Sequence, residues 1–212
     1  MGKLIIIGNG PLKQLITEYA IACKGNDPIE NSIYYICLIE DIVDKDKENS
    51  TFLGAVENYQ PQKEDEFICS YFDTNKRERS TQYIEERGGS FITLIHPSAN
   101  VSKSALIGTG SVIGAFSTVS VNVTLGKHVM IQDHCNIGHD CMIGNYSHVF
   151  VGCILSGFNN VGSHATLYTH TTLYPKVSIG NGAIVGACSV VMRKVKMGET
   201  VSGYPAKKIE TI

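Results

Sequence analysis

The sequence predicts two fold classes in one chain: a small parallel α/β unit of Rossmann type, followed by an all-β left-handed parallel β-helix. Two observations support this prediction. The first ninety residues alternate strand-like and helix-like segments, whereas an aliphatic residue stands at every sixth position afterwards. A period of six is produced neither by an α-helix, with its period of 3.6, nor by an ordinary strand, with its period of 2. It is typical of the hexapeptide repeat of a β-helix.

The N-terminal part contains four predicted strands and two predicted helices. Leucine and isoleucine fill residues 4–7, and apolar residues at Leu12, Leu15, Ile16 and Tyr19 have helical spacing. The strands are expected at residues 4–7, 33–39, 66–70 and 91–94, and the helices at 12–23 and 76–87. Because strands and helices alternate, we expect a parallel sheet.

The aliphatic series runs from Ile95 to Met197 without an insertion. A small residue precedes most of these positions by two places, and glycine often follows directly. Three hexads form one triangular coil of eighteen residues, with the aliphatic side chain inside and the small one beside it. We therefore predict domains at residues 1–90 and 91–202, followed by a C-terminal tail at 203–212.

Composition excludes several classes of function. The formal net charge is −2, with no long run of one sign, so neither a nucleic-acid groove nor a polybasic membrane patch is expected. No signal peptide or membrane-spanning segment is predicted. Seven cysteines without a CxxC pair fit a reducing cytoplasm, and no metal site is indicated. Cys135, Cys141 and Cys153 each stand two places before an aliphatic position, where the repeat has a small, inward-facing side chain. They are therefore predicted to be packing residues.

His139 is the strongest candidate for a catalytic side chain. Asp140 follows it and can hold the imidazole in one tautomer. Gly157 stands eighteen residues later, one coil further along the β-helix, where its N–H can bind a carbonyl oxygen. A base beside a backbone donor fits acyl transfer, although a surface histidine is more often simply solvated. Four other histidines stand at the same position of the repeat, three residues after an aliphatic one: His128, His134, His164 and His170. They either lie at corners of the coil or line a subunit contact.

Two further groups of residues are candidates for binding. His148 lies nine residues after His139, half a coil away, so the two share a site only if another chain presents its own His148; this spacing favours a homotrimer. The turn Gly8, Asn9 and Gly10 after the first strand is either a phosphate cradle or an ordinary strand-to-helix turn. Glu40 and Asp41, at the end of the second strand, are positioned to meet a ribose or a base.

Residues 136–148, Gly157 and residues 203–207 resemble the bacterial sugar acetyltransferases of the sialic-acid O-acetyltransferase type. That family includes the N-acetyltransferases that make bacillosamine and perosamine. The resemblance implies that His139 is the general base, that Asp140 orients it, and that Gly157 contacts the thioester of acetyl-CoA. It also implies that His148 contacts acetyl-CoA from the adjacent subunit, and that Gln132 is a polar residue near the base.

The resemblance implies a cytoplasmic, homotrimeric, acetyl-CoA-dependent N-acetyltransferase. Its acceptor would be a nucleotide-linked amino sugar (a 4-amino-4,6-dideoxyhexose) for surface polysaccharide or glycan biosynthesis, with the nucleotide held by the N-terminal domain. Two alternatives stay open: O-acetylation of a sugar hydroxyl, and a non-enzymatic β-helix that binds or scaffolds. Relatives often carry glycines where this chain has Leu12, Lys13 and Phe72, which leaves the acceptor open.

Overall fold

The structure, a computed structural model, describes residues 2–24 and 33–209. The chain divides into two compact units, Met1–Leu94 and Ile95–Ile212, which are described separately below. The division falls four residues after the end of the predicted N-terminal domain. No helix within the described residues has the length and apolar character needed to cross a membrane.

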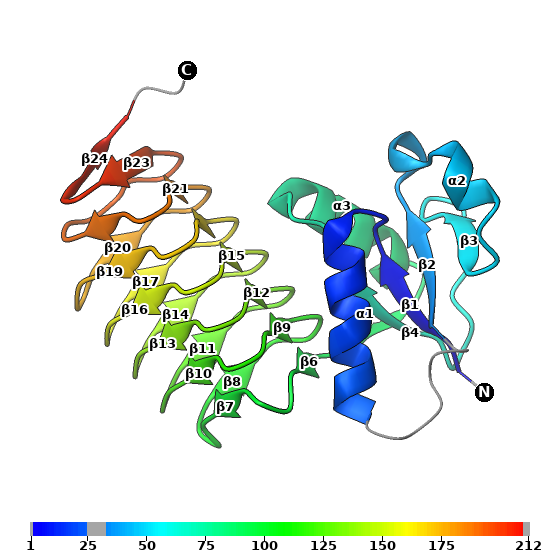
Figure 1. Ribbon diagram of the computed structural model, residues 1–212, viewed down its shortest axis with the longest axis horizontal. Coiled ribbons are helices and arrows are strands. Elements are labelled where there is room, and N and C mark those ends of the chain that lie inside the picture. The colour runs from blue at the N-terminus through cyan, green and yellow to red at the C-terminus, as the bar shows by residue number, and fades with distance from the viewer. Residues whose placement is uncertain (1, 25–32, 210–212) are drawn as a thin grey trace. The chain divides into compact units, whose positions relative to one another are not determined.

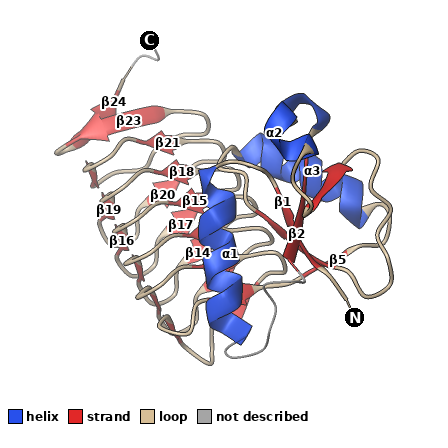
Figure 2. Cartoon of the chain, turned by 45° about the vertical axis from the view of Figure 1, so that its right-hand side comes forward, coloured by secondary structure: helices blue, strands red, loops and turns tan. Residues whose placement is uncertain are grey.

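The N-terminal unit is built on one parallel sheet (Figures 1 and 2). Its strands, in spatial order, are β3 (Phe52–Ala55), β2 (Ile33–Cys37), β1 (Leu4–Ile7), β4 (Glu66–Cys69) and β5 (Ser90–Phe91). Its helices are α1 (Pro11–Lys24), α2 (Asp44–Lys47) and α3 (Thr74–Glu85), with a 3₁₀ turn at Ile39–Asp41. All four strand pairings are parallel, in agreement with the α/β pattern of the sequence.

Three short elements of this unit were not predicted, namely β3, the 3₁₀ turn and α2, and several predicted boundaries move. Strand β3 carries Gly54 and is only partly buried, so its four residues lack a strand pattern. The second strand ends at Cys37 because the chain enters the 3₁₀ turn. Helix α3 begins two residues before its predicted start, because the Asp73 carboxylate caps it by accepting the N–H groups of Asn75 and Lys76, each at 2.9 Å.

The C-terminal unit is a parallel β-helix of two-residue strands stacked in three sheets (Figures 1 and 2). The β13 sheet contains β7 (Asn100–Val101), β10 (Thr118–Val119), β13 (Asn136–Ile137), β16 (Ile154–Leu155), β19 (Thr172–Leu173) and β22 (Val190–Val191). The β14 sheet contains β8 (Leu106–Ile107), β11 (Thr124–Leu125), β14 (Met142–Ile143), β17 (Asn160–Val161) and β20 (Ser178–Ile179). The β15 sheet contains β6 (Leu94–Ile95), β9 (Val112–Ile113), β12 (Met130–Ile131), β15 (His148–Val149), β18 (Thr166–Leu167), β21 (Ile184–Val185), β23 (Thr200–Gly203) and β24 (Ala206–Lys208).

Residues eighteen apart pair throughout the regular coils, as in Thr118 with Asn136 and Asn136 with Ile154. The predicted aliphatic position is the second residue of each two-residue strand, and every such residue from Ile113 to Val191 is buried. From Ser111 to Cys153, the serine and cysteine residues two places earlier are buried as well. Each donates to a carbonyl fifteen residues on, as Cys135 Sγ does to Phe150 O at 3.0 Å. The predicted packing role of the three cysteines is thereby confirmed.

The predicted interior position of Met197 is wrong, because the last coil is two residues shorter than the others. Ile179 pairs with Val195, sixteen residues later, and Val185 pairs with Val201. The two valines occupy the interior, while the Met197 side chain is 72% exposed. Strand β24 then pairs antiparallel with β23, so part of the predicted C-terminal tail forms the last strand; residues 210–212 lie outside the described range.

Every sixth residue from Gly110 to Cys188 has a positive φ and turns the chain from one sheet to the next. These corners include all four histidines that share one position of the repeat: His128, His134, His164 and His170. The first of the two alternatives, a corner position, is thus confirmed. Several corner rings stack on the ring one coil away, with centroids 5.1 to 5.2 Å apart. Whether these corners also contact another subunit stays a prediction.

We expect Ile137→Ala to lower the free energy of unfolding by about 2–5 kcal/mol, because it leaves a cavity in the fully buried interior. Met197→Ala is the matched control, and its exposed side chain should contribute no more than about 0.5 kcal/mol. Denaturant unfolding at one fixed chain concentration measures both values. Equal losses for the two variants would contradict the shortened last coil.

Candidate active site

His139 and Asp140 lie at the corner that joins β13 to β14. Asp140 has φ 57°, a left-handed conformation that aspartate tolerates better than most residues. His139 Nδ1 is 2.8 Å from Asp140 Oδ2, and the imidazole side chain is 51% exposed. The imidazole is thus held through one nitrogen, and its other nitrogen remains accessible.

Asn122, one coil earlier at the same corner, holds the other oxygen of this carboxylate. Asn122 Nδ2 donates to Asp140 Oδ1 at 3.2 Å. The hydrogen bonds from His139 and then Asn122 lower the pKa of Asp140, so its carboxylate is ionised at neutral pH. An ionised carboxylate can only accept, which puts the proton on Nδ1 of His139 and the lone pair of the neutral ring on Nε2.

Gly157 lies against this Nε2 atom, as the eighteen-residue spacing requires. A Cβ atom at position 157 would lie 2.5 Å from Nε2, so only glycine leaves the space beside the ring open. Phe158 bonds its N–H to the His139 carbonyl at 3.0 Å and packs its ring against the imidazole, 5.0 Å between centroids and nearly perpendicular. Within the described residues, the Gly157 N–H takes part in no hydrogen bond. A proton acceptor and an available donor are therefore neighbours.

His148 and Gln132 are not brought to His139 within one chain. His148 opens β15 in a different sheet, where its ring is buried and stacks on Phe150 at 4.0 Å. Gln132 was expected near the base, yet it follows β12 at another corner, and its Oε1 accepts the Val151 N–H at 3.3 Å. The reason is geometric: offsets of seven and nine residues are not whole coils of eighteen.

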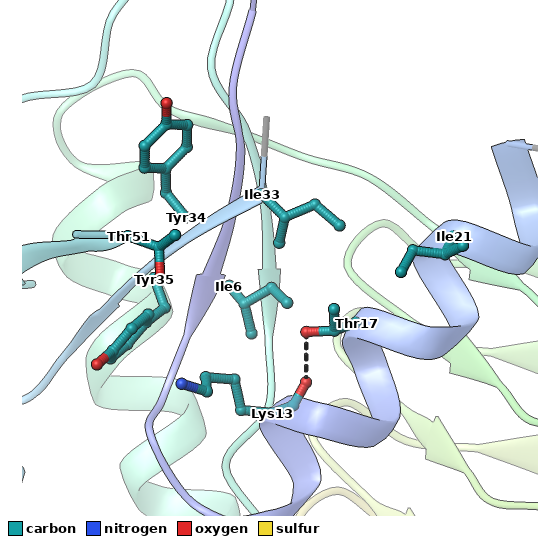
Figure 3. A pocket seen from close by; sticks show the side chains of 8 residues that line it. All are labelled: Ile6, Lys13, Thr17, Ile21, Ile33, Tyr34, Tyr35 and Thr51. Atoms are coloured by element: carbon teal, nitrogen blue, oxygen red, sulfur yellow. Dashed lines mark hydrogen bonds between the residues drawn. The ribbon is translucent and has the colours of Figure 1, made fainter. Parts of the chain in front are cut away.

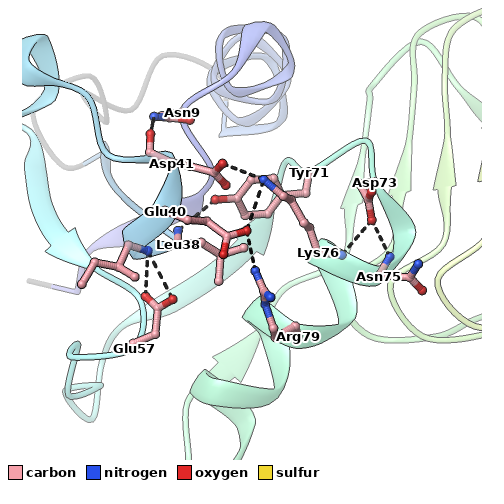
Figure 4. Close-up of polar contacts among 11 residues, drawn as sticks. Asn9, Leu38, Glu40, Asp41, Glu57, Tyr71, Asp73, Asn75, Lys76 and Arg79 are labelled. Atoms are coloured by element: carbon pink, nitrogen blue, oxygen red, sulfur yellow. Dashed lines mark hydrogen bonds and ion pairs between the residues drawn. The ribbon is translucent and has the colours of Figure 1, made fainter.

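The turn after β1 is held by contacts within its own unit. Gly8 has φ 126°, and its N–H donates to Ile36 O at 2.7 Å. The Asn9 amide donates to the Asp41 carbonyl (Figure 4) and also to Asp46 Oδ2. Gly10 precedes α1, and apart from its chain neighbours no atom of the described residues lies within 4 Å of where its Cβ would be. Asn9 therefore serves to fix the loop, and the space beside Gly10 is open.

Glu40 and Asp41, the predicted ribose or base contacts, are ion-paired with helix α3 (Figure 4). Lys76 Nζ lies 2.6 Å from Asp41 Oδ1 and 3.5 Å from Glu40 Oε1, and Arg79 pairs with Glu40 at 2.7 Å. A ligand that uses this acidic pair has to share it with two cations. Sequence reasoning identified α3 only as a polar helix and missed these partners.

A cavity of about 270 Å³ lies beside α1 in the same unit (Figure 3). Its lining consists of Ile6, Lys13, Thr17, Ile21, Ile33, Tyr34, Tyr35 and Thr51. The Lys13 ammonium lies 3.5 Å from the centre of the Tyr35 ring, and burial lowers the pKa of Lys13. None of the predicted site residues lines this cavity. Among the described residues, no cluster of His, Cys, Asp and Glu has the arrangement of a metal site.

The stacked hexapeptide β-helix, the parallel α/β unit and the oriented histidine at a corner agree with the resemblance to sugar acetyltransferases that the sequence motifs indicate. No family model and no curated protein sequence matches the chain. Solved structures do match. PerB from Caulobacter crescentus, in complex with CoA and GDP-perosamine, has 25% identity over 99% of this chain and 98% of that chain, with a TM-score of 0.87. The acetyltransferase domain of PglB from Neisseria gonorrhoeae, in complex with acetyl coenzyme A, has 26% identity over 98% of both chains, with a TM-score of 0.85.

WeeI from Acinetobacter baumannii, at 20% identity over 99% of this chain and 100% of that chain, shares the fold with a TM-score of 0.86. The resemblance predicted from the sequence motifs is therefore confirmed, and it extends over essentially the whole chain. The fold of the C-terminal unit fits a left-handed β-helix acetyltransferase.

We expect Asn122→Leu to raise the pKa of Asp140 towards its ordinary value, because one of two donors to the ionised carboxylate is lost. The His139 bond remains, so the pKa should stay below that of a free aspartate. An NMR titration of the carboxyl carbon measures the shift, with the exposed Asn160→Leu as control. An unchanged Asp140 pKa in Asn122→Leu would show that this hydrogen bond does not act on the carboxylate.

Proposed function

We propose that the chain is an acetyl-CoA-dependent N-acetyltransferase that acts on the amino group of a nucleotide-linked amino sugar. The observation that carries the proposal is the His139 Nε2 atom beside Gly157, whose N–H is not used by the described residues. Structures similar to this one contain CoA with GDP-perosamine, or acetyl coenzyme A, which favours an amine acceptor over a sugar hydroxyl.

The site residues fit acyl transfer. Acetyl-CoA would supply the acetyl group as a thioester, and the space that a Cβ at Gly157 would fill admits such a group beside the ring. As the amine nitrogen attacks the acyl carbon, His139 accepts the proton that the amine loses. The C–S bond of the thioester then breaks, and the coenzyme would leave as a thiolate that takes up a proton. Ionised Asp140 stabilises the resulting imidazolium. The Gly157 N–H donates to the acyl oxygen as negative charge develops there.

The remaining roles complete the proposal. The N-terminal unit is a Rossmann-like domain that holds the nucleotide near Gly8, Asn9, Gly10 and the acidic pair Glu40 and Asp41. The enzyme is a cytoplasmic homotrimer, and His148 of a neighbouring subunit reaches the coenzyme. Gln132 is a substrate-binding residue near the base. Because His148 is buried in the single chain, this contact requires the side chains around it to move. Sedimentation equilibrium tests the assembly, and a monomer at working concentration would contradict the shared site.

Incubation with acetyl-CoA and a panel of nucleotide-linked 4-amino sugars tests the reaction directly. Mass spectrometry should show the gain of one acetyl group on the amine. Acetylation of a hydroxyl instead would establish the O-acetyltransferase alternative. Absence of both transfer and acetyl-CoA binding by calorimetry would favour a non-enzymatic β-helix.

We expect His139→Ala to lower turnover by about 10²- to 10⁴-fold, the usual contribution of a general base. His134→Ala is the matched control, because His134 is also an exposed corner histidine but lies away from Gly157. Steady-state kinetics on the purified assemblies measures both. Near-normal turnover in His139→Ala would remove this residue from the mechanism.

A further inference from the structure

At three corners of the β-helix, a side chain one coil later occupies a backbone N–H group. An Asp or Asn side-chain oxygen accepts the N–H of the residue one coil earlier, eighteen positions before it. The bonds run from Ala115 N to Asp133 Oδ1 at 2.7 Å, from Lys127 N to Asn145 Oδ1 at 2.9 Å, and from Ser163 N to Asn181 Oδ1 at 3.0 Å. We call this arrangement the corner cap.

Each corner cap also requires a glycine directly before the capped residue. These glycines are Gly114, Gly126 and Gly162. In all three cases a Cβ built on the glycine would overlap the capping oxygen. A corner cap therefore has two parts: a glycine that leaves room for the oxygen, and an Asp or Asn one coil later that supplies it.

Both parts are absent at Gly157. The residue directly before it is Ser156, which has a Cβ atom, and the residue one coil later is Pro175, which has no side-chain acceptor. Pro175 is exposed, and Ser156 is only half-buried, so neither identity is imposed by the interior of the β-helix. The Gly157 carbonyl is used, by the Lys176 N–H at 3.1 Å, whereas the Gly157 N–H has no partner among the described residues.

We propose that Ser156 and Pro175 are positioning residues that keep the Gly157 N–H uncapped, so that it can donate to the acyl oxygen of a thioester. The proposal rests on the proposed function. It adds the reason why the donor is available at this corner although the same fold closes it at three others. An unpaired N–H in a partly exposed corner is held ready for a ligand, because no internal bond has to break first.

The test installs the missing cap. Ser156→Gly/Pro175→Asn supplies both parts, whereas Ser156→Gly/Pro175→Leu has a side chain of similar shape without an acceptor. We expect the Asn variant to lose about 10²- to 10³-fold in kcat, as when one oxyanion donor is removed, with a much smaller change in the KM for acetyl-CoA. The Leu variant should keep a kcat close to that of the unchanged chain. Pro175→Asn alone should lose less, because the Ser156 Cβ obstructs the oxygen.

Amide hydrogen exchange of Gly157 in the ligand-free protein gives a second readout that does not depend on activity. Exchange should be slower in the Asn double variant and unchanged in the Leu variant. Unchanged exchange in the Asn variant, or slowed exchange with normal kcat, would overturn the proposal. If the unchanged chain transfers no acetyl group, the proposed function is refuted. Slowed Gly157 exchange in the Asn double variant would still confirm that Ser156 and Pro175 leave the N–H open.

Discussion

The parallel pairing of residues eighteen apart is the constraint on which the C-terminal unit depends. Each coil hydrogen-bonds to the next through backbone groups, as in Gly138 N to Leu155 O at 2.8 Å, so the coils cannot slip without losing their pairing. The same register places like side chains above one another. Aliphatic residues form the interior column, serine and cysteine form a second buried column, and left-handed residues form each corner.

The candidate active site is a local departure within this regular frame. At several other corners the columns contain stacked rings or capped N–H groups. At the corner between β13 and β14 they consist instead of Asn122 and Asp140, with His139 beside Gly157. The regular coils fix the backbone to which these groups belong. A few unusual residues at one corner are thus enough to place a base beside an available donor, without any distortion of the fold.

The repeat could be predicted because it is local and periodic, and so could the neighbourhood of His139 and Gly157. The same arithmetic would have found Asn122, which lies eighteen residues before Asp140. It failed for Met197, where the last coil loses two residues. The expectation that Gln132 lies near the base came from the family resemblance, and within one chain its offset from His139 is not a whole coil. The ion pairs of Lys76 and Arg79 join helix α3 to the turn after β2. These two segments share no sequence repeat, so no pattern could predict the pairs.

A crystal structure of the chain with CoA and a nucleotide-linked amino sugar would test the central claim most directly. We expect the sugar nitrogen to lie about 3–3.5 Å from His139 Nε2, a distance suited to proton transfer, with the coenzyme sulfur beside Gly157. A coenzyme bound along another corner of the β-helix, with the His139 imidazole facing only solvent, would contradict it.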